Sequence, residues 1–86
     1  MKLDKMDSLD KMIGEYFTLK RIEYRYTQVQ VAQLIGTNRN TYVHYELGNR
    51  SMPLSVMKKL CILYHLDYYE TFKYLDKEAV RKGIIQ

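Results

Sequence analysis

The sequence has little of what secreted and membrane-spanning proteins usually show. A single cysteine, Cys61, excludes an internal disulfide and fits a reducing compartment. No apolar run approaches the roughly 20 residues needed to cross a bilayer. Residues 1–12, MKLDKMDSLDKM, carry acidic groups and lack the apolar core of a signal peptide. We therefore expect a cytoplasmic protein without a membrane partner.

Groups for catalysis or metal binding are also scarce. His44 and His65 are the only histidines, and no carboxylate pair, nucleophile motif or phosphate-cradling loop accompanies them. Even together with Cys61 they are too few and too widely spaced for a zinc site. We expect a protein that is not an enzyme and that needs no cofactor or metal.

What the chain does contain is apolar material for one small domain and an uneven excess of positive charge. Its 86 residues, 47% of them hydrophobic, suffice for a modest core. The net charge of +4 divides into −1 over residues 1–19, +3 over residues 20–50 and +2 over residues 51–86. The excess is densest in the middle of the chain, as a polyanion partner would require, although a solvated basic surface explains it equally well.

Residues 28–50, QVQVAQLIGTNRNTYVHYELGNR, indicate two short helices joined by a tight turn. The first is expected to end before Gly36, which is free to take a positive φ. Asn38 is a suitable N-cap for the second, which should run to about Leu47 and stop at Gly48. This arrangement predicts a helix-turn-helix. The apolar face of the first helix comprises Val31, Ala32, Leu34 and Ile35.

The second of these helices has two different faces at 100° per residue. Thr41, Tyr42 and Tyr45 fall on the side expected to pack in the core. The other side combines a guanidinium, an amide, an imidazole and aliphatic groups, a set suited to reading base edges in a major groove. That side comprises Arg39, Asn40, Val43, His44 and Leu47.

The stretch from residue 27 to residue 53 also follows one spaced pattern: TQ-x-x-hydrophobic-A-x-x-hydrophobic-G, four residues and T, then Y-x-E-x-G-x-R, then P. The matching residues are Thr27, Gln28, Val31, Ala32, Ile35, Gly36, Thr41, Tyr45, Glu46, Gly48, Arg50 and Pro53. This pattern resembles the Cro/cI-type (XRE) helix-turn-helix family of phage repressors and their bacterial relatives. The resemblance extends over residues 13–72.

The resemblance implies an all-α fold, a compact five-helix bundle of the lambda repressor-like type. We expect an extension over residues 1–11, either an extra helical turn or a frayed arm, and the DNA-binding domain over residues 12–75. The tail over residues 76–86 can be helical and part of a dimer interface.

Three further helices complete the expected bundle. Helix 1 should run from Met12 to Tyr24, helix 4 from Leu54 to Tyr64, and a fifth helix should follow Asp67 as its N-cap. In helix 1, the residues expected to point inward are Ile13, Phe17 and Tyr24, with Leu19 or Ile22 beside them; in helix 4 they are Val56, Met57, Leu60, Cys61 and Tyr64.

The resemblance also implies roles for particular residues. Arg21 and Glu46 match a structural salt bridge of the family, and Arg25 stands where the family usually has glycine, so a positive φ there would be strained. The residues expected to read bases are Asn38, Arg39, Asn40, Val43 and His44. Those expected to contact phosphates are Gln28, Asn49, Arg50 and the amide of Ser51, with the hydroxyl of Tyr42 as an alternative to core packing.

These observations predict a sequence-specific double-stranded DNA-binding regulator, a repressor acting as a homodimer on a palindromic operator. The expected dimer surface, chosen for its apolar surplus, comprises Tyr68, Tyr69, Phe72, Leu75, Ile84 and Ile85. Three other hypotheses stay open: a restriction-modification controller protein, an antitoxin, and a protein-interaction module that has lost DNA binding. An antirepressor or a toxin is a conceivable protein partner.

Overall fold

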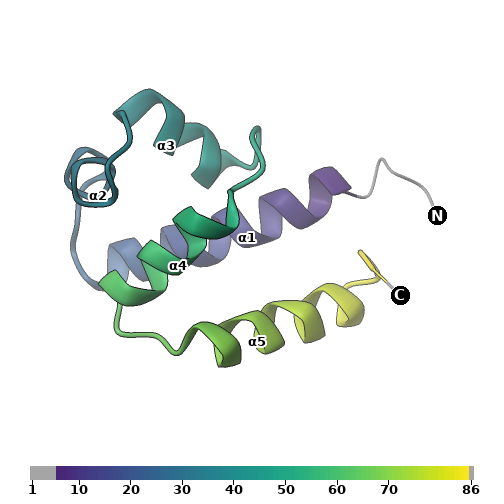
Figure 1. Ribbon diagram of the computed structural model, residues 1–86. Helices are drawn as coiled ribbons and strands as arrows, with labels where there is room; N and C mark the ends of the chain where they lie inside the picture. The colour runs from purple at the N-terminus through teal and green to yellow at the C-terminus, as the bar shows by residue number, and fades with distance from the viewer. Residues whose placement is uncertain (1–5, 86) are drawn as a thin grey trace.

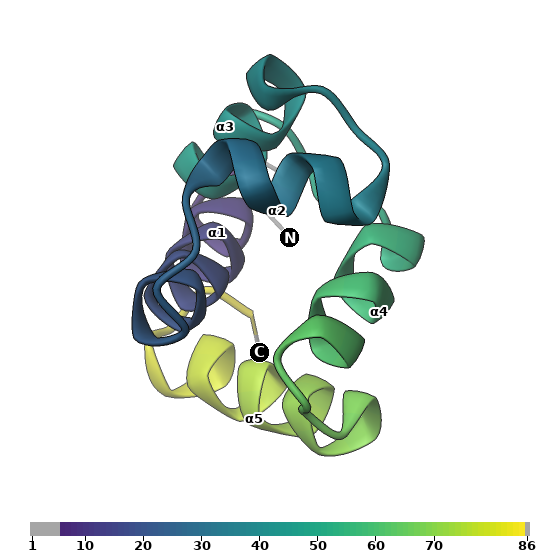
Figure 2. The same cartoon turned by 90° about the vertical axis from the view of Figure 1, so that its left-hand side faces the viewer.

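The computed structural model describes residues 6–85, and these form five α-helices without a strand. Helices α2 and α3 lie at one end, α5 lies at the other, and α1 and α4 lie between them (Figures 1 and 2). The predicted all-α bundle is therefore confirmed. The helices are α1 (Met6–Glu23), α2 (Gln28–Ile35), α3 (Arg39–Leu47), α4 (Leu54–Leu63) and α5 (Tyr68–Arg81).

The core consists of a main cluster and a smaller one. The main cluster is formed by side chains of α1, α2, α3 and α4. It includes Phe17, Tyr42, Leu60 and Tyr64, each with no exposed surface. The smaller cluster, formed by Met12, Leu75 and Ala79, holds α5 against α1. Burial of these large side chains supplies most of the energy that keeps such short helices together.

Local signals fix the ends of α2 and α3. Thr27 and Gln30 form a capping box at the start of α2, and Gly36 ends that helix with φ 78°. Asn38 Oδ1 accepts a hydrogen bond from Thr41 N at 2.7 Å and so caps α3, which ends at Gly48 with φ 75°. The bounds predicted for these two helices agree with the structure.

Other expected boundaries differ. Helix α1 begins at Met6, six residues before the expected start, so only residues 1–5 of the expected extension lie outside the described residues. Helix α4 ends one residue early, at Leu63. Helix α5 continues to Arg81 and so includes residues 76–81 of the expected tail, because Leu75 and Ala79 continue one buried stripe.

Four side chains expected to point inward are exposed. Tyr24 is 41% exposed, because it follows the end of α1 and packs on Tyr64 through one side of its ring. Leu19 and Ile22 are 59% and 56% exposed, because they lie far around α1 from the buried Phe17. Leu34 is 59% exposed, because the short α2 buries only the stripe of Val31, Ala32 and Ile35.

Two turns contain strained residues. Arg25 after α1 has φ 62°, and His65 after α4 has φ 54°. Both lie in the left-handed region, where a Cβ is unfavourable. The Tyr24 hydroxyl donates to the Tyr64 carbonyl oxygen at 2.8 Å, so a hydrogen bond ties the two turns together.

We predict that Arg25→Gly and His65→Gly each stabilise the fold by about 1 kcal/mol, because glycine removes the steric cost of the positive φ. Urea denaturation would measure the gain, with Arg25→Ala as the control that shortens the side chain but keeps the Cβ. A gain from Arg25→Ala as large as that from Arg25→Gly would show that backbone strain is not the cause.

Candidate nucleic-acid interface

The outer face of α3 presents polar and aliphatic groups at the end of the molecule opposite α5 (Figure 1). Arg39 and Asn40 are exposed in its first turn, and Val43 and His44 are half-buried one turn later. Asn38 uses its side-chain oxygen to cap the helix, so its side-chain NH2 group is the part that could turn towards a ligand. The exposed start of α3 therefore carries strong hydrogen-bond donors.

The loop after α3 extends this surface. Asn49, Arg50 and Ser51 are all exposed behind Gly48. Asn49 Nδ2 lies 3.4 Å from His44 Nδ1, which connects the loop to the last turns of the helix. The loop and the outer face of α3 thus form one continuous polar surface.

Gln28 joins the surface from the first turn of α2. Its Nε2 donates to Glu46 Oε1 at 3.0 Å. The same carboxylate receives Arg21 Nε at 2.7 Å and Arg21 Nη2 at 3.2 Å, while Arg21 Nη1 donates to the Tyr26 carbonyl oxygen at 2.8 Å. The Glu46 carboxylate therefore connects α1, α2 and α3.

This ion pair is shielded from water. The Glu46 side chain is 3% exposed and the Arg21 side chain 15%. Burial by itself would raise the pKa of Glu46, but hydrogen bonds from Arg21 and Gln28, with the charge of Arg21, outweigh it and leave that pKa below its ordinary value. Glu46 is accordingly ionised at neutral pH.

Gly14 allows α1 to approach α3 closely beside this ion pair. A Cβ at Gly14 would lie 2.5 Å from the carbonyl oxygens of Tyr45 and Glu46, a distance that real contacts exclude. The two helices are therefore in backbone contact, which fixes the angle at which α3 is presented.

Tyr42 does not belong to this surface. Its side chain has no exposed area and packs in the main cluster, and burial raises the pKa of its hydroxyl. A hydroxyl in that position cannot reach a phosphate, so the alternative role considered for Tyr42 is wrong.

The residues expected to form a dimer surface are divided between two environments. Leu75 is buried, Ile84 and Ile85 pack against the smaller cluster, and Tyr68 packs against the main one. Phe72 is half-buried, whereas Tyr69 is 70% exposed. The apolar surplus is smaller than expected, because part of it closes the monomer.

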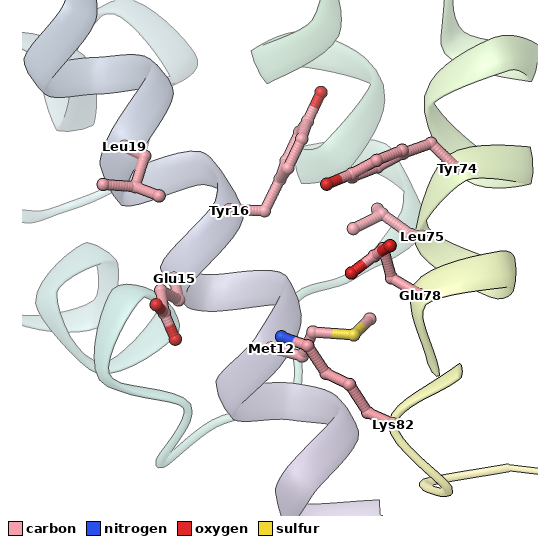
Figure 3. A pocket seen from close by; sticks show the side chains of 8 residues that line it. All are labelled: Met12, Glu15, Tyr16, Leu19, Tyr74, Leu75, Glu78 and Lys82. Atoms are coloured by element: carbon pink, nitrogen blue, oxygen red, sulfur yellow. The ribbon is translucent and has the colours of Figure 1, made fainter. Parts of the chain in front are cut away.

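Figure 3 shows a hollow between α1 and α5, into which Tyr16 and Tyr74 point from opposite sides. Its volume of about 100 Å³ is small beside the roughly 300–1,000 Å³ of typical small-molecule sites. Within residues 6–85, no three His, Cys, Asp or Glu side chains are placed to hold a metal ion. No helix in that range is both long and apolar enough to cross a membrane.

Besides the contact of Tyr24 with Tyr64, two more long-range contacts were not predicted from the sequence. Ser51 Oγ donates to Asp10 Oδ2 at 2.9 Å, and Lys59 Nζ donates to the Ile35 carbonyl oxygen at 3.1 Å. Both join residues more than twenty positions apart, and no periodic pattern marks such pairs. Asp10 also lay in the segment treated as an extension.

Comparison with known proteins agrees with a helix-turn-helix formed by α2 and α3. A sequence model of the helix-turn-helix family matches residues 19–70, from the second half of α1 to the first turn of α5. A search of curated proteins gave no match.

We predict that Arg21→Met costs about 3 kcal/mol of stability at neutral pH, because it leaves the Glu46 charge buried without its partner. In the wild type, Glu46 contributes stability above its ordinary pKa of 4.5 and loses it as the pH falls through the lowered value. In the variant the pKa of Glu46 should rise, so acidification should neutralise the carboxylate and reduce the penalty.

The matched control is Arg81→Met. Arg81 Nη2 also lies 2.7 Å from a carboxylate, that of Glu78, but the Arg81 side chain is 67% exposed. Chemical denaturation between pH 4 and pH 7 should therefore show a change below about 0.5 kcal/mol for this control. Equal losses for both variants, or an Arg21→Met penalty that grows towards acid pH, would contradict the assigned role of the buried pair.

Proposed function

Since the chain belongs to the XRE-type helix-turn-helix family of DNA-binding transcriptional regulators, we propose that it is a repressor that binds a palindromic operator as a homodimer. The observation that carries the proposal is the gathering of Arg39, Asn40 and Gln28 with residues 49–51 on one surface. The repressor assignment rests on analogy with phage and mobile-element regulators.

In this proposal the start of α3 reads bases. Arg39 donates from both arms of its guanidinium to O6 and N7 of guanine, and the Asn40 amide bridges N6 and N7 of adenine. Both side chains are exposed, so they can enter a major groove without rearrangement of the core. Val43 would contact a thymine methyl group, while His44 and the Asn38 amide would lie at the groove edge.

The phosphate contacts would come from the two sides of α3. Gln28 has one N–H of its amide occupied by Glu46, which leaves the second N–H for a phosphate oxygen. On the other side, Asn49, Arg50 and the Ser51 amide lie in the exposed loop. Phosphate contacts on both sides would fix the register of α3 in the groove.

We predict that substitutions of base-reading residues weaken binding to the specific site, whereas substitutions of phosphate-contacting residues weaken binding to all duplexes. Arg39→Ala and Asn40→Ala should each lose about 1–3 kcal/mol on the specific site and little on random DNA. Arg50→Ala should weaken binding to all duplexes alike and make the salt slope shallower by about one unit. Binding selections on randomised duplexes, followed by salt titrations, would measure both effects.

Two results would contradict this assignment. If wild type, Arg39→Ala and Asn40→Ala all select one consensus sequence, these residues do not read DNA. If Arg50→Ala changes the consensus but not the salt slope, its contact is to a base.

The proposed dimer uses the outer face of α5. Tyr69 and Val80 are 70% and 53% exposed, and the exposed Lys73 and Asp76 lie between them. At 100° per residue these four residues fall within roughly 60° of one another. They therefore form one mixed stripe on the helix surface.

That stripe is complementary to itself. In an antiparallel two-fold pairing centred between residues 74 and 75, Tyr69 would meet Val80 of the partner subunit. Lys73 would meet Asp76 of the partner subunit, and the two-fold axis repeats both contacts. In this one register, opposite charges face each other and apolar side chains face each other.

We predict that Lys73→Asp weakens the dimer about tenfold, because it places two carboxylates opposite each other on both sides of the two-fold axis. Asp76→Lys alone should have a similar effect, and the double variant should restore association. Sedimentation equilibrium measures all three. A monomeric wild type, or a double variant weaker than either single variant, would exclude this pairing.

A further inference from the structure

The amino-terminal part of α1 lies directly against the loop that leaves α3. A Cβ at Gly48 would lie 2.6 Å from the Cα of Lys11, so the two main chains are in contact. Figure 1 shows the purple end of α1 beside this loop. Together with the contact at Gly14, this leaves the early turns of α1 in a fixed position relative to the loop that carries Arg50 and Ser51.

Asp10 is the residue that α1 presents to this loop. Ser51 Oγ donates to Asp10 Oδ2 at 2.9 Å. Ser51 is exposed and Asp10 is half-buried, so the carboxylate stands at the surface. A negative charge is thereby held one hydrogen bond away from a residue whose amide is proposed to bind a phosphate.

The position of this charge is unfavourable for a DNA-binding surface. A phosphate oxygen on the Ser51 amide would lie roughly 3 Å from that nitrogen, and the Asp10 carboxylate accepts from the hydroxyl of the same residue, so the two charges would lie within roughly 9 Å of each other. Two negative charges at that separation repel each other, and salt screens the repulsion only in part. The other charged side chains here, Arg39, Arg50 and Lys11 against Gly48, are all basic, so Asp10 is the one carboxylate among them.

We propose that Asp10 is an affinity-limiting residue of the DNA interface, which holds the Ser51 hydroxyl and repels the adjacent phosphate. The effect acts on the DNA backbone, so it lowers affinity for every duplex and leaves sequence preference unchanged. It also favours release, because weaker binding is mostly faster dissociation. This proposal rests on the phosphate-contacting role proposed for residues 49–51.

The test is a charge series at residue 10. Asp10→Asn keeps an oxygen that can accept from Ser51 and removes the charge, and Asp10→Lys reverses the charge. The matched controls are Glu70→Gln and Glu70→Lys, which change net charge equally on the exposed first turn of α5, at the other end of the molecule (Figure 1). Because Glu70 Oε1 lies 4.0 Å from Nζ of Lys73, which belongs to the proposed dimer surface, affinities are compared at protein concentrations where sedimentation gives all variants the same association state. Fluorescence anisotropy would follow binding to a duplex selected from a random library and to a random-sequence duplex over a range of NaCl concentrations.

Asp10→Asn should tighten binding to both duplexes by about two- to fivefold, most strongly at low salt. Asp10→Lys should tighten it further and steepen the salt slope by about one unit, because it adds a phosphate contact. The Glu70 variants should change affinity by less than about twofold, since they lie beyond the reach of a screened charge.

The proposal is overturned if Asp10→Asn weakens binding, or if it changes binding no more than Glu70→Gln does. Arg50→Ala, measured alongside, separates two kinds of failure. If Arg50→Ala weakens binding while Asp10→Asn does nothing, only the role of Asp10 is wrong; if Arg50→Ala is also silent, the phosphate-contacting role of the loop fails as well.

Discussion

The buried carboxylate of Glu46 holds α1, α2 and α3 together. It stands on α3 and accepts hydrogen bonds from Arg21 on α1 and Gln28 on α2. A charge that is only 3% exposed is costly unless it is paired, so the three helices must keep the one arrangement that pairs it. Gly14 makes that arrangement possible, because any side chain there would collide with the α3 backbone.

This constraint explains how two very short helices form a defined surface. Helices of 8 and 9 residues are not stable alone in water. Their caps at Thr27 and Asn38 fix where each begins, and the core side chains beneath α3 fix its rotation. The ion pair then sets the angle between them. Arg39 and Asn40 gain a defined direction from this framework although neither touches it.

The sequence allowed the helix-turn-helix to be predicted almost to the residue, because caps and glycine stops such as Asn38 and Gly48 act locally. The pairing of Arg21 with Glu46 came from the family resemblance, since a contact across 25 positions has no local signal. The start of α1 was misplaced, because charged residues at its beginning conceal its periodicity. The contact of Asp10 with Ser51 was not predicted either, because the two residues are 41 positions apart and only the packing of α1 against the loop brings them together.

We propose that α3, the first turn of α2 and residues 49–51 form a single DNA-binding face. Amide chemical-shift mapping during titration with a selected duplex would test this face residue by residue. The largest shifts should occur at Gln28, over residues 38–44 and over residues 49–51, with small shifts along the outer face of α5. Shifts concentrated on α4 or α5, with residues 38–44 unchanged, would contradict it.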